Sequence, residues 1–152
     1  MKVIGIIPCR YQSSRFPGKP LALINGKPMM WHVYQRALES NVLDKVYIAT
    51  DNERIVEVAN EYSLNTVMTS DKHETGTDRV AEAASQIQAD YYVNIQGDEP
   101  FINPESIKLV IQAIIGCDDP LVQAANAYTS ISDVSDVVDT NNVKVIMDVN
   151  QQ

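Results

Sequence analysis

The sequence lacks any long hydrophobic run, since nothing in it approaches the roughly 18 consecutive apolar residues of a membrane-spanning helix. The first apolar run, Val3–Ile7, is too short for a signal-peptide core, and no small-residue cleavage site follows it. Two cysteines, Cys9 and Cys117, are too few and too far apart for a disulfide framework. We therefore predict a cytoplasmic protein with reduced thiols and no contact with membranes.

Acidic residues are absent from the first quarter of the chain. Residues 1–38 hold six of the 12 Lys and Arg residues and none of the 20 Asp and Glu residues. The net charge of −8 argues against general binding to nucleic acid. The asymmetry nevertheless indicates a local anion site, most simply for a small molecule that carries phosphate. Charge alone leaves open the alternative that these cations lie by chance on a solvated surface.

Short apolar runs alternate with amphipathic stretches along the 152 residues, of which 45% are hydrophobic and only six are glycine and seven proline. This composition predicts one globular domain over residues 1–152. The predicted strands are Val3–Ile7, Val46–Thr50, Thr66–Met68, Tyr91–Ile95, Leu121–Tyr128 and Val143–Met147. The predicted helices begin at Pro28, after a cap at Asp51 or Asn52, after a cap at Thr77, and after Asn103.

Strands that alternate with helices predict an α/β fold, doubly wound, with a mostly parallel sheet and helices on both of its faces. Such sheets bind ligands beyond the carboxyl ends of the strands, where the strand order reverses. The loops at 8–20, 50–52, 69–77 and 96–100 are therefore the predicted site. Only five residues follow the last predicted strand, so we expect an incomplete fold whose open sheet edge favours self-association.

Familiar phosphate and metal motifs are missing. No three glycines fit the dinucleotide fingerprint G-x-G-x-x-G, which disfavours a dehydrogenase. Gly18-Lys19 lacks the earlier glycine of a P-loop and is followed by Pro20. The thiols and imidazoles are too scattered to predict a metal centre.

The loop after the first strand combines charge with stiffness. Arg10, Arg15 and Lys19 place three cations within ten residues, and Pro17, Gly18 and Pro20 restrict or shape the backbone between them. Guanidinium groups suit phosphate oxygens, and Lys adds a mobile charge. We interpret this loop as a site for several phosphates, with a plain basic surface loop as the alternative.

Two further loops carry polar residues. Gln96 and Asp98 follow the strongest predicted strand, where Asp98 could bind Mg²⁺ together with substrate phosphates or could cap the next segment. Beyond the loop at 70–77, Arg79 lies one turn into the Thr77 helix and could point into the crevice. His73 has no evident carboxylate partner in the sequence, which favours a bystander role.

Four segments, in order, resemble the 3-deoxy-manno-octulosonate (KDO) cytidylyltransferase family, the CMP-KDO synthetases. They are Ile7–Leu21, Ile24–Met29, His73–Arg79 and Asn94–Pro100. Each segment alone is weakly specific, but four at compatible spacing make a specific match. The sequence Gln96-Gly97-Asp98-Glu99-Pro100 favours the KDO branch over the sialic-acid-activating relatives, which share the basic first loop.

The resemblance implies a nucleotide-diphospho-sugar transferase fold, Rossmann-like, and a cytoplasmic enzyme that works as a homodimer in lipopolysaccharide biosynthesis. Its reaction would be Mg²⁺-dependent transfer of CMP from CTP to the anomeric hydroxyl of KDO, with release of pyrophosphate. By position, Arg10, Lys19 and Asp98 would be catalytic, and Asp98 would bind Mg²⁺. Substrate contacts would come from Arg10, Arg15, Lys19, Thr75, Arg79 and Gln96, with cytosine held by backbone around 8–10 and 70–75.

Two departures from the family pattern accompany the resemblance. Cys9 stands where the family usually has Ala, a small-for-small change that we expect to be tolerated. The match covers about the N-terminal three-fifths of the family's chain, so we expect weak CTP binding and little turnover. The alternatives are another acidic sugar, such as 8-amino-KDO or a sialic acid, and a non-catalytic nucleotide-binding module.

Overall fold

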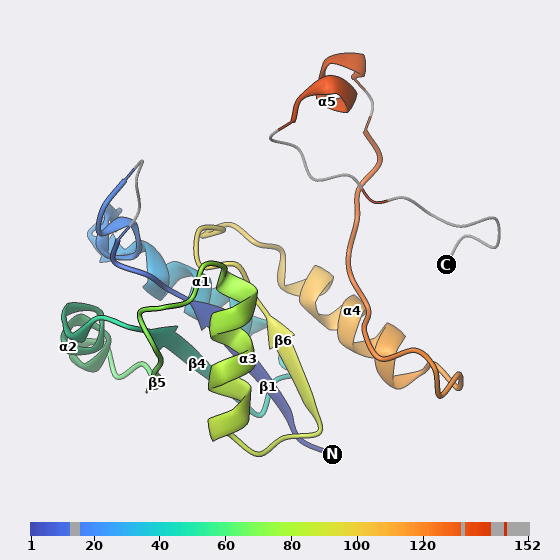
Figure 1. Ribbon diagram of the computed structural model, residues 1–152, viewed down its shortest axis with the longest axis horizontal. Helices are drawn as coiled ribbons and strands as arrows, with labels where there is room; N and C mark the ends of the chain where they lie inside the picture. The colour runs from blue at the N-terminus through green and yellow to red at the C-terminus, as the bar shows by residue number, and fades with distance from the viewer. Residues whose placement is uncertain (13–15, 132, 141–144, 146–152) are drawn as a thin grey trace.

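The computed structural model describes residues 1–12, 16–131, 133–140 and 145. Its main sheet has four strands, β1 (Val3–Pro8), β4 (Lys45–Thr50), β5 (Thr66–Met68) and β6 (Tyr91–Asn94). The strand order is β5-β4-β1-β6, and each neighbouring pair is parallel. A small antiparallel pair, β2 (Leu23–Ile24) with β3 (Lys27–Pro28), stands apart from it. The predicted mostly parallel sheet is confirmed (Figure 1).

Helices cover both faces of this sheet (Figure 1). The core on one face combines side chains from α1 (Met29–Glu39), α2 (Glu53–Glu61) and α4 (Pro104–Ile115). On the other face, α3 (Gly76–Gln86) packs on Ile4 and Ile6 of β1 through Val80 and Ala83. The interior of β1 is buried throughout because it is central and covered twice, which explains its continuous apolar sequence. A short helix, α5 (Val134–Val138), follows later in the chain.

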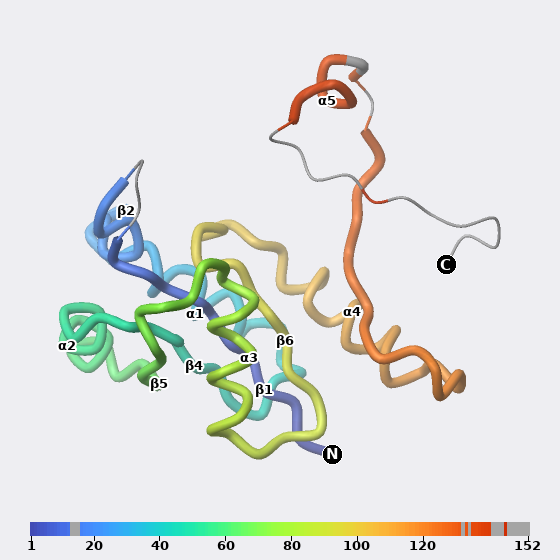
Figure 2. Tube along the Cα trace, in the orientation of Figure 1, coloured from blue at the N-terminus to red at the C-terminus, as the bar shows by residue number. Residues whose placement is uncertain are grey.

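The direction of the strand order reverses at β1, because β4 lies on one side of it and β6 on the other. Loops that leave adjacent parallel strands therefore emerge at one end of the sheet, on either side of this switch point. Figure 2 shows the loops after β1 and β6 and the loop before α3 at that common end. The fold places the predicted loop regions together.

The helix starts follow local capping chemistry. Asn52 caps α2 and Asn103 caps α4, as predicted. The predicted cap of α3 at Thr77 is wrong, because Thr75 holds that position. Thr75 forms a capping box in which its hydroxyl accepts from the Asp78 N–H and the Asp78 carboxylate accepts from the Thr75 N–H. Thr77 could not form such a box, because the residue three positions after it is Val80, whose apolar side chain cannot accept a hydrogen bond from the N–H of the cap residue.

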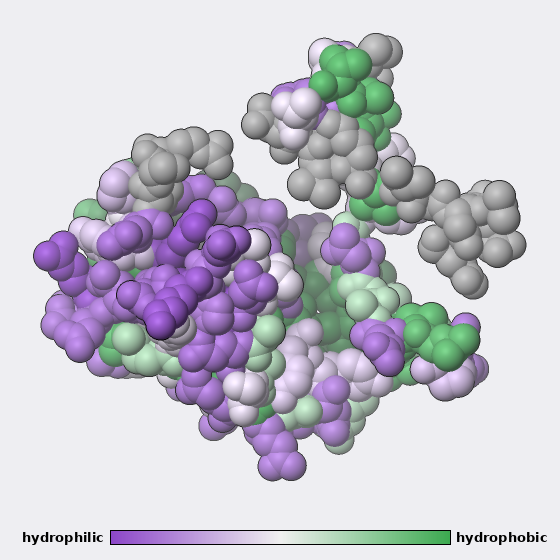
Figure 3. All heavy atoms as spheres, in the orientation of Figure 1, coloured by the Kyte–Doolittle hydropathy of each residue, from purple (hydrophilic) through white to green (hydrophobic). Residues whose placement is uncertain are grey.

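The predicted strand Leu121–Tyr128 is also wrong, since this segment is irregular. Residues 122–127 instead line a cavity of about 900 Å³ beside β6 and α4, and Figure 3 shows apolar side chains gathered around this hollow. The side chains of residues 122–127 are mostly small, with three alanines among them, which does not favour a strand. A strand also needs a neighbouring strand with which to pair. Within the described residues, β6 is at the edge of the sheet. The predicted strand Val143–Met147 lies outside the described residues, apart from Val145.

Among the described residues, none of the helices has the length and apolar character needed to cross a membrane.

The two cysteines have opposite environments. Cys9 is 1% exposed, and its burial raises the pKa of its thiol to about 12, whereas Cys117 is exposed. Since the thiolate is the reactive form, we predict that one thiol per folded chain reacts with an aromatic disulfide reagent at about pH 8. Cys117→Ser should remove this reaction, and denaturant should restore one reactive thiol. Rapid reaction of folded Cys117→Ser protein would contradict the placement of Cys9.

Candidate functional site

Three segments meet at Pro8 and Cys9, where β1 ends. The Cys9 N–H donates to the carbonyl of Ala49 at the end of β4, over 2.8 Å. Gly97, after β6, lies so close that a Cβ built on it would stand 2.5 Å from the Pro8 carbonyl oxygen. A Cβ on Gly76, at the start of α3, would stand 3.3 Å from the Pro8 ring. The end of β1 is therefore the centre of the predicted site.

The first loop is folded back on itself. Gly18 has a φ of +71°, a left-handed conformation that glycine adopts without strain, and its N–H donates to the Tyr11 carbonyl over 2.7 Å. The Tyr11 ring lies against Gly18. Arg54 of α2 stacks on that ring and donates to the Tyr11 hydroxyl over 3.0 Å. These contacts fix the part of the loop from which Lys19 projects, while Arg15 lies outside the described residues.

Lys19 and Asp98 form an ion pair across the switch point. The Lys19 Nζ atom donates to Asp98 Oδ2 over 2.8 Å, and the two side chains are 36% and 53% exposed. Such an exposed pair contributes little to stability, so both groups can change partners at small cost. Arg10 is exposed on the same loop. Gln96 is exposed on the β6 loop and donates to Asn94 over 3.3 Å.

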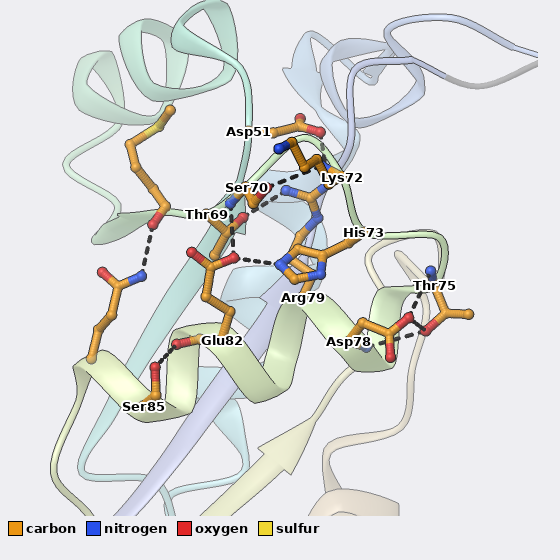
Figure 4. Close-up of polar contacts among 12 residues, drawn as sticks. Asp51, Thr69, Ser70, Lys72, His73, Thr75, Asp78, Arg79, Glu82 and Ser85 are labelled. Carbon is orange, nitrogen blue, oxygen red and sulfur yellow. Dashed lines mark hydrogen bonds and ion pairs between the residues drawn. The ribbon is translucent and has the colours of Figure 1, made fainter.

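Arg79 is buried, with only 2% of its surface exposed. Its guanidinium donates to Asp51 Oδ2 over 2.7 Å and to Thr69 Oγ1 over 2.6 Å, as Figure 4 shows. These bonds connect the ends of β4 and β5 to α3. The guanidinium thus has protein partners in this structure, and a substrate contact through Arg79 stays a prediction.

His73 has a carboxylate partner, so the expectation that it has none was wrong. Its Nε2 atom contacts Glu82 of α3, and Glu82 also accepts from the Ser70 N–H over 2.8 Å (Figure 4). These hydrogen bonds, that of His73 first, lower the pKa of the Glu82 carboxyl from its ordinary 4.5. Because Glu82 is therefore an ionised acceptor, His73 must carry its proton on Nε2.

Thr75 uses its hydroxyl in the cap of α3. That hydroxyl accepts from the Asp78 N–H over 3.1 Å and donates to the Asp78 carboxylate over 2.7 Å. Hydrogen bonds from the Thr75 hydroxyl and then from its N–H lower the pKa of the Asp78 carboxyl. The substrate contact predicted for Thr75 would compete with these bonds.

The donor set near the switch point suits one particular kind of metal site. No group of three His, Cys, Asp or Glu residues that could hold a metal ion occurs in the part of the chain that the structure describes. Asp98 is exposed, with the exposed Glu99 next to it. Mg²⁺ keeps several waters and often takes one or two protein carboxylates plus substrate phosphates. Asp98 therefore fits a magnesium ion that arrives with a nucleotide, rather than a permanent metal centre.

Gly97 is predicted to be essential to the shape of the site. In Gly97→Ala the new Cβ would meet the Pro8 carbonyl at 2.5 Å, which forces the backbone apart. We expect a loss of about 2 kcal/mol or more in the free energy of unfolding, measured with urea.

Gly26→Ala is the matched control for this substitution. Gly26 has a φ of +78°, but its Cβ would meet nothing within 4 Å. Its loss should be about 1 kcal/mol, from backbone strain alone. Equal losses for the two variants would mean that the Gly97 contact is not tight.

Comparison with known proteins gives a consistent result. A family model described as Cytidylyltransferase matches residues 4–152. The 3-deoxy-manno-octulosonate cytidylyltransferase of Pelobacter propionicus is 45% identical over 148 residues, which are 97% of this chain and 57% of that protein. The Escherichia coli protein of the same name is 40% identical over 150 residues, 99% of this chain and 60% of its own length. The chain thus spans less than two thirds of these relatives.

Solved structures agree on the fold. A CMP:2-keto-3-deoxy-manno-octonic acid synthetase complexed with CTP is 43% identical, with a TM-score of 0.76 over 80% of this chain and 50% of that one. A nucleotidyl transferase from Methanothermobacter, 17% identical with a TM-score of 0.62 over 73% of this chain and 57% of that one, shares the fold. From the family match over nearly its whole length, the chain belongs to the cytidylyltransferase family.

Proposed function

We propose that this chain binds CTP with Mg²⁺ and supports transfer of CMP to the anomeric hydroxyl of KDO, with release of pyrophosphate. The observation that carries the proposal is the 2.8 Å contact between Lys19 and Asp98. It supports the proposal because a lysine cation suits phosphate oxygens and a carboxylate suits Mg²⁺. The similar structure bound to CTP and the names of the curated relatives support the choice of nucleotide and sugar.

The proposed reaction depends mainly on charge. Both substrates are anions, and in-line displacement at phosphorus needs positioning and charge neutralisation more than covalent participation by the protein. Arg10, Arg15 and Lys19 would bind the triphosphate and stabilise the pyrophosphate as it leaves. Asp98 would hold Mg²⁺, which when bound supplies further neutralisation at the phosphates.

The unreactive state of the thiol at this site supports direct transfer of CMP from CTP to the sugar. Cys9 lies at the centre of the site but is buried, and its pKa of about 12 keeps it in the unreactive thiol form. A covalent intermediate on Cys9 is therefore not part of the proposal. In its place, the sugar hydroxyl would attack the α-phosphate directly.

The Lys19–Asp98 pair suits a site that changes partners on binding. Without nucleotide each charge neutralises the other, which avoids two unpaired charges in the crevice. In the proposed complex, Lys19 would turn to phosphate and Asp98 to the metal. The low cost of separating an exposed pair supports this exchange.

The proposal includes the wider setting that the resemblance implies: KDO as the acidic sugar, an active homodimer, and a cytoplasmic place in lipopolysaccharide biosynthesis. A different acidic sugar and a non-catalytic CTP-binding module are the alternatives. Because the chain spans 57% of its relative from Pelobacter propionicus, binding and turnover need separate tests.

The test of binding is calorimetry with CTP, ATP and GTP, each with and without Mg²⁺. We expect CTP to be preferred and Mg²⁺ to strengthen its binding. Lys19→Ala should weaken CTP binding by about tenfold or more through the loss of one phosphate contact. Lys108→Ala is the matched control, because Lys108 pairs with Glu105 on the outer surface of α4 and should leave CTP affinity unchanged.

Equal affinity for the three nucleotides, or no effect of Lys19→Ala, would contradict the proposed site. Pyrophosphate release with CTP, Mg²⁺ and either KDO or 8-amino-KDO then identifies the sugar. CTP binding without release from any sugar would favour the non-catalytic module.

A further inference from the structure

Arg54 has an unfavourable place in its helix. It stands in the first turn of α2, where the helix dipole favours acidic side chains such as the preceding Glu53. The cap of α2 does not need the Arg54 side chain, because Asn52 accepts from the backbone N–H of Arg54. Within the described residues, the guanidinium forms no ion pair with a carboxylate. A charge placed against the dipole without such a pair indicates a role outside α2.

The partner of Arg54 is Tyr11 in the first loop. The centre of the guanidinium lies 5.3 Å from the centroid of the Tyr11 ring, and its Nη1 atom donates to the Tyr11 hydroxyl over 3.0 Å. Tyr11 is half-buried and packs against the apolar core on the α1 and α2 face of the sheet. Figure 1 shows α2 beside the first loop, in agreement with these contacts. Tyr11 is thus held by the core and by Arg54 together.

Tyr11 in turn fixes the turn at Gly18. Its carbonyl accepts from the Gly18 N–H over 2.7 Å, and its ring carbons would lie 3.4 and 3.5 Å from a Cβ built on Gly18. The Gly18 carbonyl accepts from the Leu21 N–H over 2.9 Å, within a short 3₁₀ turn, η1 (Lys19–Leu21). Because Lys19 is the first residue of η1 and follows Gly18 directly, its backbone is fixed on both sides.

A lysine that binds phosphate gains from such support. Its side chain is long and loses rotamer freedom when a ligand holds it, so a backbone that is already in place lowers the total cost of binding. The Lys19 side chain reaches across the switch point to Asp98 over 2.8 Å. If the Gly18 turn were free to open, the Lys19 backbone would move with it and carry the ammonium group away. The contact of Arg54 with Tyr11 therefore affects where the Lys19 charge lies.

We infer that Arg54 and Tyr11 are positioning residues for phosphate binding: their stacked pair holds the Gly18 turn, and the turn holds Lys19 ready for the triphosphate. The inference rests on the proposed function. It assigns a role to Arg54, which lies outside the four segments that carry the family resemblance. In the proposed complex, Arg54 stays on Tyr11 and does not bind phosphate itself.

The test measures the affinity for CTP and for inorganic tripolyphosphate, both with Mg²⁺, by calorimetry. In Arg54→Ala we expect both affinities to fall by about fivefold, through the loss of one cation–π contact and one hydrogen bond. In Arg54→Lys an ammonium group can still lie over the ring, so most of the affinity should return. In Tyr11→Phe, which keeps the ring and loses only the hydroxyl, the loss should be about twofold.

A double-mutant cycle separates positioning from direct binding. If Arg54 acts through Lys19, then Arg54→Ala should have almost no further effect on the affinities of Lys19→Ala protein. Losses that multiply in the double variant would mean that Arg54 contacts the phosphates or attracts them by its charge alone. That result would overturn the inference.

Lys45→Ala is the matched control. Lys45 is an exposed cation at the start of β4, at the opposite end of the sheet from the site. Its removal takes away the same charge as Arg54→Ala and should leave both affinities unchanged. Arg54 is itself exposed, and α2 keeps its cap when Arg54 is replaced, so Arg54→Ala should fold. A lower melting temperature with unchanged affinities would show a structural role only and overturns the inference.

Failure of the inference can be told apart from failure of the proposed function. Unchanged CTP affinity in Arg54→Ala, when Lys19→Ala still weakens CTP binding, overturns the inference and leaves the proposed function standing. If the unsubstituted chain does not bind CTP, the proposed function and the inference both fail.

Discussion

The parallel pairing of β1 with β6 is the constraint on which the candidate site depends. Lys19 and Asp98 are distant in sequence, and this pairing brings their loops to one end of the sheet, where the side chains lie 2.8 Å apart. The close approach requires Gly97, because any side chain there would meet the Pro8 carbonyl. A packing requirement of the backbone thus sets the positions of the two charges proposed for phosphate and metal.

A second constraint acts through α3. Its residues Arg79 and Glu82 connect the ends of β4 and β5 to one helix, and a capping box at Thr75 fixes where that helix begins. The two sides of the candidate site are consequently built differently. The first loop carries exposed cations that can move to a ligand, whereas the 69–75 loop is held by buried or partly buried polar contacts. Mobile charge suits the phosphates proposed as ligands of the first loop.

Local patterns predicted most of the fold. Apolar runs between turn signals predicted all four strands of the main sheet, and the caps at Asn52 and Asn103 stand beside their helices in sequence. What could not be predicted depends on distance in space. To predict the contact of His73 with Glu82, one must know which side of α3 faces the loop that precedes it. To predict the burial of Arg79, one must know that the ends of β4 and β5 lie beside it. Leu121–Tyr128 has the pattern of a strand but pairs with no strand within the described residues.

The most direct test of the account is a crystal structure of the chain with CTP and Mg²⁺. The account predicts triphosphate oxygens bound by Arg10 and Lys19, a metal ion held by Asp98 beside the triphosphate, and the Lys19–Asp98 contact broken. Triphosphate bound away from Lys19, or a metal ion held without Asp98, would contradict it.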